Sequence, residues 1–224
     1  MSDPLKLSAS LWSADLSALA HSIERVNEYC DSYHFDIMDG HYVKSLLFGV
    51  DTVASLRDKT DRPFEVHLMV RNPKDFVNDF VGAGANLIQF QFDGVDNPAS
   101  HIEQIKSLDA NAGICVLEET PIEKVFDLLP LVDNLLVMGT KIGVKGVSII
   151  PETYEKIRLA RKYIDENDLN VSIQADGGIR RNTVPELFRA GVNSVTAGSL
   201  LFRNDPKEIK QWVNSLSGEL RNEN

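Results

Sequence analysis

Residues 34–41 read His34-Phe35-Asp36-Ile37-Met38-Asp39-Gly40-His41. Side chains two apart on a strand point the same way, so His34, Asp36 and Met38 are expected on one face and Phe35 and Ile37 on the other. The stretch is apolar enough to be buried, yet a buried histidine or aspartate is costly unless it is paired or holds a metal. It therefore predicts a β-strand whose polar face belongs to a functional site.

The same combination of apolar and ionisable residues recurs twice. It is found in Glu65-Val66-His67-Leu68-Met69 and in Gln174-Ala175-Asp176-Gly177-Gly178. Together the three stretches supply two histidines and two aspartates, which suit a borderline divalent ion such as zinc, iron(II), manganese or cobalt. They predict a site for one divalent metal ion, formed by His34, Asp36, His67 and Asp176, with two carboxylates available as bases.

Short apolar runs alternate with amphipathic stretches along the whole chain. Strands are predicted at 7–11, 33–38, 64–69, 87–92, 113–117, 135–138, 171–175 and 194–197, each followed by a helical stretch. One of these helices begins near Thr120 and Glu123, which have capping-box spacing. Eight strand-then-helix units predict parallel strands and a closed (β/α)8 TIM barrel, with a doubly wound open sheet as the alternative. No linker divides the chain, so residues 1–224 are expected to form a single domain with a frayed polar tail at 219–224.

A barrel of this type carries its chemistry at the carboxyl ends of the strands. Three of the four methionines, Met38, Met69 and Met138, fall near such ends and are candidates for an apolar collar, or simply for packing. Glycine-containing turns follow the last two predicted strands, as Gly177-Gly178 and Gly198-Ser199. Because phosphate sites recur in these two loops of TIM barrels, the turns predict a phosphate-binding site.

Bulk properties narrow the class of protein. The chain has 224 residues and a formal net charge of −10, which argues against general nucleic-acid binding. Cys30 and Cys115 form no disulfide framework or ligand pair, which fits a reducing compartment. The start of the chain lacks the apolar core of a signal peptide, and no apolar run is long enough to span a membrane. A cytoplasmic protein with no nucleic-acid or membrane partner is expected.

With these residues in place, the chain resembles the ribulose-phosphate 3-epimerase family over nearly its full length. The resemblance is carried by an ordered set of motifs, namely Ser10-Leu11-Trp12-Ser13-Ala14-Asp15, residues 34–41, His67-Leu68-Met69-Val70, Asn72-Pro73, Asp176-Gly177-Gly178 and Ala197-Gly198-Ser199 with Phe202. Each motif is short, but their order on successive predicted strands is specific.

The resemblance implies a reaction and roles for residues. A 2-keto sugar phosphate, first of all D-ribulose 5-phosphate, would be epimerised at C3 to give D-xylulose 5-phosphate through an enediolate, with a divalent ion as Lewis acid. Asp36 and Asp176 would be the two acid/base groups as well as metal ligands, together with His34 and His67. Ser10 would contact substrate, and the three methionines would shield the intermediate. The resemblance also implies a homo-oligomer, a dimer or larger.

The chain departs from the family pattern at several positions. Lys44-Ser45 replaces the usual Pro-Asn, Gln91-Phe92-Asp93 replaces His-x-Glu, and Gln174 replaces a glutamate. The usual loop Asn-Pro-Gly-Phe-Gly-Gly-Gln is replaced by Thr140-Lys141-Ile142-Gly143-Val144-Lys145-Gly146, whose two lysines are either phosphate contacts or solvated surface residues.

Three other functions stay open on these residues. The first is the same chemistry on another ketose phosphate, such as D-allulose 6-phosphate, which the altered loops would permit. The second is an aldolase or decarboxylase of a related barrel, against which stands the absence of a lysine in the predicted strands and of an Asp-x-Lys-x-x-Asp motif. The third is a non-catalytic relative that only binds a sugar phosphate, against which stand the intact ligand positions.

Overall fold

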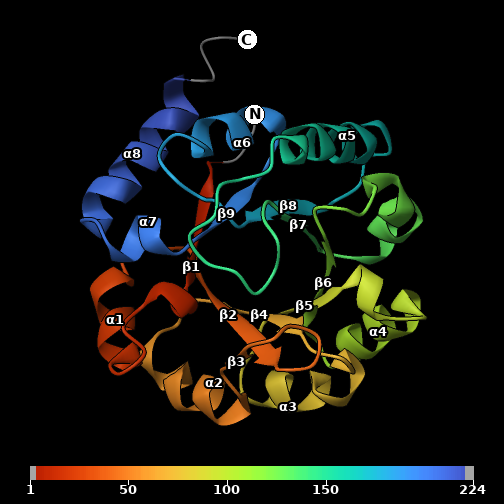
Figure 1. Ribbon diagram of the computed structural model, residues 1–224, viewed down its shortest axis with the longest axis horizontal. Coiled ribbons are helices and arrows are strands. Elements are labelled where there is room, and N and C mark those ends of the chain that lie inside the picture. Colours follow the sequence, from red (N-terminus) through yellow and green to blue (C-terminus); the bar gives the residue numbers. More distant parts are fainter. Residues whose placement is uncertain (1–3, 220–224) are drawn as a thin grey trace.

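The protein is a closed parallel β-barrel surrounded by helices, as a computed structural model describing residues 4–219 shows (Figure 1). The parallel strands are β1 (Lys6–Ser10), β2 (Ser32–Asp39), β4 (Phe64–Met69), β5 (Leu87–Gln91), β6 (Asn111–Val116), β7 (Asn134–Met138), β8 (Ser172–Asp176) and β9 (Ser194–Ala197). Each pairs with its neighbours in chain order, and β1 pairs in parallel with both β2 and β9, which closes the ring. The predicted (β/α)8 TIM barrel is confirmed.

Helices cover the outside of the ring. The α-helices are α1 (Leu19–Val26), α2 (Val50–Leu56), α3 (Val77–Gly82), α4 (Pro98–Lys106), α5 (Glu152–Glu166), α6 (Val184–Ala190), α7 (Ser199–Phe202) and α8 (Pro206–Glu219). The 3-10 helices are η1 (Leu11–Ser13), η2 (Arg57–Lys59), η3 (Pro73–Asp75), η4 (Phe92–Gly94) and η5 (Ile122–Leu131). No helix in residues 4–219 is both long and apolar enough to cross a membrane.

The structure differs from the sequence-based expectation in three local respects. A short strand, β3 (Leu46–Leu47), pairs antiparallel with β2, and α7 follows β9; neither was predicted. The prediction of a capping box at Thr120 is wrong, because the Thr120 hydroxyl donates to Asp93 Oδ2 at 2.6 Å instead of capping the helix. The helix that follows, η5, is a 3-10 helix. The predicted tail at 219–224 lies outside the described residues except for Glu219, where α8 ends.

The apolar core lies between the barrel and its helices rather than inside the barrel. Outward residues of the strands, such as Phe35 and Ile37 of β2 and Val66 and Leu68 of β4, belong to one large buried cluster together with helix residues such as Ile157. Each such side chain contributes about 1.5–3 kcal/mol on burial. The alternation predicted for β2 is thereby confirmed, and the inward positions are left for polar side chains.

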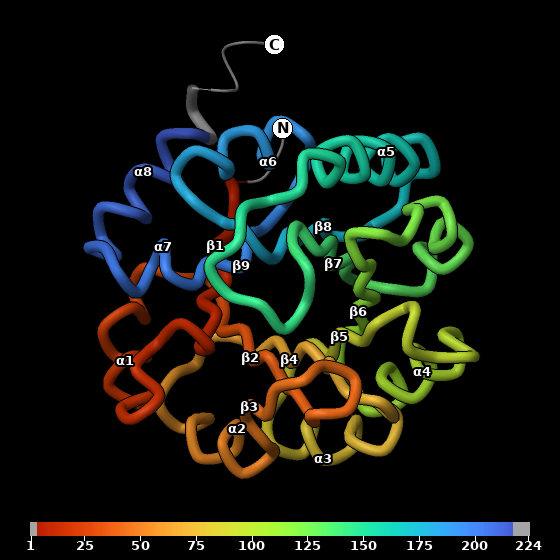
Figure 2. Tube along the Cα trace, viewed as in Figure 1, coloured from red at the N-terminus to blue at the C-terminus, as the bar shows by residue number. Residues whose placement is uncertain are grey.

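The segment between β7 and α5 crosses over the mouth of the barrel (Figure 2). Its two ends are held together, because Ile150 N–H donates to Gly139 O at 2.8 Å and Gly139 N–H donates to Asp176 O at 2.6 Å. We call residues 140–149 the mouth loop. Because it begins at the carboxyl end of β7, it lies over the end of the barrel where the predicted site residues gather.

Candidate active site

The four predicted metal ligands converge at the mouth of the barrel. His34 and Asp36 come from β2, His67 from β4 and Asp176 from β8, and one ligand atom from each lies within 4.8 Å of all the others. Register brings them together, because Asp36 pairs with His67 across the β2–β4 ladder. Asp36 Oδ1 lies 3.4 Å from His34 Nε2 and 3.5 Å from His67 Nδ1, and Asp176 Oδ2 lies 3.7 Å from His34 Nε2.

Two orphaned nitrogens show that this group fits a metal ion. His34 Nε2 and His67 Nδ1 are buried and have no hydrogen-bond partner within the described structure. Both face the carboxylates of Asp36 and Asp176. A buried polar atom without a partner is rare and costly, whereas two imidazole lone pairs and two carboxylates make a normal donor set for a borderline divalent ion. The residues therefore could hold such an ion.

Without a metal the four groups share protons unevenly. Burial opposes protonation of His34, but the carboxylates of Asp36, Glu65 and Asp176 together outweigh it and raise the pKa of His34 well above its usual value. Burial opposes ionisation of Asp36 too, yet His34 holds the pKa of Asp36 well below its ordinary range. Burial, together with the charge of Asp36, raises the pKa of Asp176 to about 7. One carboxyl is thus ionised, and the other takes up a proton near neutral pH.

Metal affinity is therefore expected to rise with pH. His34 must lose a proton to bind a metal, and Asp176 must as well below about pH 7, where its raised pKa keeps it neutral. The apparent association constant should increase by more than about tenfold per pH unit in the acidic range and less steeply above it. Calorimetric titration of metal-free protein, in buffers of different ionisation enthalpy, counts the released protons. Release of no protons at about pH 6 would contradict this account.

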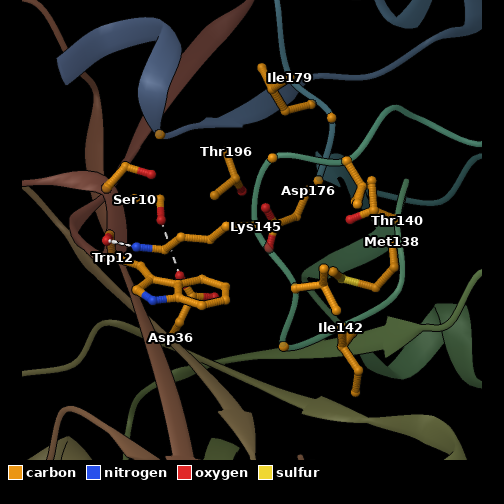
Figure 3. Close-up of a pocket in the computed structure, with 18 of the residues that line it drawn as sticks. Ser10, Trp12, Asp36, Met138, Thr140, Ile142, Lys145, Asp176, Ile179 and Thr196 are labelled. Atoms are coloured by element: carbon orange, nitrogen blue, oxygen red, sulfur yellow. Dashed lines mark hydrogen bonds between the residues drawn. The ribbon is translucent and has the colours of Figure 1, made fainter. Parts of the chain in front are cut away.

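Ser10 and two of the three methionines line the pocket above the four ligands. The Ser10 hydroxyl donates to Asp36 Oδ2 at 3.0 Å, and Met138 forms part of the wall (Figure 3). Met69 lines the same pocket. Met38 is different, because it is packed with Met69 and Val43 and does not contribute to the pocket lining. Of the three methionines predicted to form an apolar collar, Met69 and Met138 thus line the pocket, and Met38 packs against Met69.

The glycines of the last two loops permit close packing. Gly177 and Gly178 have φ angles of +88° and +72°, a region that favours glycine. A Cβ atom on Gly177 would lie 2.3 Å from Thr140 Oγ1, and one on Gly178 would lie 2.7 Å from Ile149 N, so both hold the mouth loop against β8. A Cβ on Gly198 would meet Ser13 Oγ at 2.5 Å. These three residues and Ser199 all line the pocket.

The two lysines of the mouth loop take different positions. The Lys145 ammonium donates to Trp12 O and lies 4.5 Å from the centroid of the Trp12 ring, so its side chain reaches across the pocket (Figure 3). Partial burial lowers the pKa of Lys145. Lys141 lines the same pocket and, like Lys145, is exposed to solvent.

The pocket also contains residues that sequence reasoning missed. Trp12 was noted only as part of a motif, and Arg180 was not considered. The Arg180 guanidinium donates to Gly146 O and Val147 O, both at 2.9 Å, and so ties the mouth loop to the loop after β8. Its place two residues after the end of the Asp176-Gly177-Gly178 turn is the one signal that could have drawn attention to it.

Comparison with known proteins decides the family. Residues 6–202 match the profile described as the ribulose-phosphate 3 epimerase family. Ribulose-phosphate 3-epimerase of Mycobacterium bovis is 38% identical over 199 residues, covering 89% of this chain and 86% of that protein. The chain belongs to the ribulose-phosphate 3-epimerase family. It is accordingly an enzyme of the isomerase class that acts on carbohydrates.

Other relatives and solved structures agree with this family membership. Proteins of the same name from Synechocystis sp. and Chlamydia muridarum are 36% and 34% identical, covering 90% and 95% of this chain and 89% and 95% of theirs. Among solved structures, a 3-hexulose-6-phosphate synthase matches with a TM-score of 0.70 at 15% identity, covering 95% of this chain and 99% of that one. Orotidine 5'-phosphate decarboxylase from Pyrococcus horikoshii gives 0.66 at 15% identity, covering 94% and 98%. At 15% identity these two structural matches support the fold assignment alone.

Two of this family member's departures lie next to the group formed by His34, Asp36, His67 and Asp176, either in contact with one of its histidines or through Glu65. The Gln91 amide lies 2.6 Å from His67 Nε2, and Gln174 donates to Glu65 Oε2 at 2.8 Å. Glu65 in turn lies 3.5 Å from His34 Nδ1. Glu65 could have been found from sequence, because it is two residues before His67 on a buried strand and so shares its face.

Proposed function

We propose that this protein is a metal-dependent 3-epimerase that interconverts D-ribulose 5-phosphate and D-xylulose 5-phosphate. The observation that carries the proposal is the convergence of Asp36 and Asp176 with His34 and His67, with ligand atoms all within 4.8 Å of one another, at the mouth of the barrel. The catalytic residues would be Asp36 and Asp176, and all four residues would hold the ion. Epimerases of this name among the relatives support the choice of substrate.

Inversion at C3 needs a proton to leave one face of the sugar and another to arrive at the opposite face. Asp36 and Asp176 come from different strands and reach the pocket from different sides (Figure 3). One aspartate, in its ionised form, removes the C3 proton to leave a planar enediolate, and the other, once protonated, returns a proton from the opposite face; their roles exchange in the reverse direction.

The remaining groups bind and orient the substrate. A bound divalent ion would act as a Lewis acid that polarises the C2 carbonyl and makes the neighbouring C3 proton easier to remove. Ser10 holds Asp36 Oδ2 in place through its hydroxyl at 3.0 Å. Met69 and Met138 place apolar surface at the pocket wall, which keeps water from the reacting carbon.

The phosphate would bind at the opposite wall of the pocket. Gly177, Gly178, Gly198 and Ser199 line the pocket in the two loops where phosphate sites recur in this fold, and backbone N–H groups of these loops would be the donors. Lys145 would add its ammonium group, exchanging Trp12 O for a phosphate oxygen, and Lys141 would contribute from the rim. The usual loop sequence of the family has no lysine, so binding of the substrate phosphate by lysine ammonium groups would distinguish this chain from the usual family pattern.

Isotope exchange tests the reaction directly. Metal-loaded protein incubated with D-ribulose 5-phosphate in heavy water should form D-xylulose 5-phosphate and place deuterium at C3. Exchange and turnover with another ketose phosphate such as D-allulose 6-phosphate, with ribulose 5-phosphate near background, would favour that substrate, which the altered mouth loop makes the second candidate. Thermal stabilisation by sugar phosphates without any exchange at C3 would instead indicate a non-catalytic relative.

Loss of the mouth-loop lysines should weaken substrate binding. Lys145→Ala is expected to raise KM about tenfold with little change in kcat, because a charge-assisted hydrogen bond is worth about 1.5–3 kcal/mol. Adding Lys141→Ala should raise KM further. Lys124→Ala, an exposed lysine on η5 outside the pocket, is the matched control. An unchanged KM in the double variant would place both lysines on the solvated surface.

A homo-oligomer, a dimer or larger, is proposed on the resemblance to the family alone. Light scattering of the purified protein measures it, and a monomer at assay concentrations would contradict it.

A further inference from the structure

The two histidines of the metal-binding group present opposite ring nitrogens to the pocket. Nε2 of His34 and Nδ1 of His67 lie 3.4 and 3.5 Å from the same oxygen, Oδ1 of Asp36. These are the nitrogens that lack a hydrogen-bond partner in the described structure. The geometry thus selects a different ligand atom on each ring.

The other nitrogen of each ring is contacted from behind. Nδ1 of His34 lies 3.5 Å from Glu65 Oε2, and Nε2 of His67 lies 2.6 Å from the side-chain nitrogen of Gln91. A neutral imidazole that gives a lone pair to a metal carries its proton on the opposite nitrogen, where it needs an acceptor. A carboxylate only accepts, so Glu65 fits the N–H of His34.

Gln91 can meet the same requirement after a half-turn of its amide. The two ends of an amide have nearly the same shape and are distinguished by their partners. Oε1 of Gln91 has no partner in the described structure, although its nitrogen faces His67. Exchanging the two ends lets Oε1 accept the N–H at Nε2 of His67, which leaves the Nδ1 lone pair free for a metal.

Glu65 is itself held firmly. It accepts from Ser8 Oγ and Ser32 Oγ, both at 2.6 Å, and from Gln174 Nε2 at 2.8 Å, and its side chain is only 12% exposed. Gln174 is fixed on its far side, since Gln89 Nε2 donates to its Oε1 at 2.8 Å. A glutamate at position 174 would set a second carboxylate against Glu65, where like charges repel. The amide of Gln174 and the carboxylate of Glu65 are therefore complementary.

We propose that Glu65 and Gln91 are positioning residues that hold the two histidine ligands in opposite tautomers. His34 binds the ion through Nε2 because Glu65 accepts its Nδ1–H, and His67 binds it through Nδ1 because Gln91 accepts its Nε2–H. This inference rests on the proposed metal-dependent function and adds to it the residues that orient the ligands.

Nuclear magnetic resonance of the wild-type protein loaded with zinc gives the direct test. Long-range correlation of imidazole nitrogens with ring protons is expected to show a protonated Nδ1 on His34 and a protonated Nε2 on His67. The same tautomer on both rings would overturn the proposal. This measurement needs no variant, so it holds even if a substitution prevents folding.

Variants separate the inference from the function on which it rests. Glu65→Met and Gln91→Met, which each remove the acceptor, are expected to lower zinc affinity about 10–100-fold in competition with a chromophoric chelator. Gln91→Glu, which keeps an acceptor, should retain the wild-type affinity and the His67 tautomer. Glu103→Met and Gln211→Glu are exposed control substitutions.

The outcomes are distinguishable. Wild-type affinity in Glu65→Met and Gln91→Met, with zinc bound normally by the wild type, would overturn the positioning roles and leave the metal-dependent function intact. Equal loss in Gln91→Glu and Gln91→Met would overturn the acceptor role of Gln91. No zinc binding by the wild-type protein would overturn the metal-dependent function and this inference with it.

Discussion

Asp176→Asn is expected to lower epimerase turnover by about 10²–10⁴-fold or more, because an amide can neither accept nor return the C3 proton. The barrel should stay folded. Burial raises the pKa of Asp176 to about 7, so at neutral pH the metal-free protein already holds this group partly uncharged. A neutral side chain of the same shape replaces it without a new cavity.

The sign of the stability change follows from the raised pKa. The folded metal-free protein keeps the Asp176 proton up to about pH 7, whereas an unfolded chain loses it near the ordinary aspartate pKa of 3.8. The stability that this proton contributes is present at low pH and is lost as pH rises towards 7. Metal-free Asp176→Asn should therefore be at least as stable as the wild type above pH 7, as thermal unfolding would measure.

Asp36→Asn should abolish turnover as well, but with a different effect on stability. Asp36 holds the pKa of His34 well above its usual value, so its loss leaves a buried imidazole without its main partner. The metal-free variant is expected to be less stable than Asp176→Asn. Asp58→Asn, on the exposed surface, is the matched control. Near-normal turnover in either active-site variant would refute the acid/base assignment.

Removal of the metal is the second large effect. Treatment with a strong chelator should reduce turnover to background, and adding back zinc, iron(II), manganese or cobalt should restore it, since His and carboxylate ligands accept several divalent ions. Binding should also raise the unfolding temperature, because an ion present at a hundredfold excess over its dissociation constant adds about 2.7 kcal/mol to the free energy of unfolding.

The Asp variants serve as controls for this experiment. Asp176→Asn and Asp36→Asn should show a much smaller metal-dependent rise in unfolding temperature than the wild type, because each lacks one ligand charge. Full turnover by protein verified to contain no metal would refute the metal role. Recovery with one ion alone would identify the metal that the site prefers.

Local patterns were sufficient to predict the barrel. Each predicted strand overlaps an observed one, because burial on a parallel strand leaves a run of apolar residues bounded by turns. Local patterns failed where a tertiary partner competes. Thr120 has the spacing of a helix cap, yet its hydroxyl donates to Asp93, which follows a different strand. The pair Leu46–Leu47 forms β3 only because the edge of β2 is available.

Prediction of the site had a similar limit. His34, Asp36, His67 and Asp176 stood out because ionisable residues are rare in buried strands, and the structure brings all four together. That Met69 lines the pocket while Met38 packs behind it could not be read from two methionines at equivalent strand ends. The link from Arg180 to the mouth loop depends on how two loops pack, which no periodicity encodes.

The sequence by itself determined the alternation of strands and helices, the polar face of the three strands that carry the site and the family, because these depend on side-chain chemistry and spacing along the chain. Only the tertiary structure decided which ring nitrogen of each histidine faces the pocket, that Glu65 and Gln91 lie behind them, and that Lys145 reaches across to Trp12. Strand register and loop packing determine which of these side chains come into contact. Residues far apart in the chain meet there, and the energies of such contacts depend on distances that appear only once the barrel has closed.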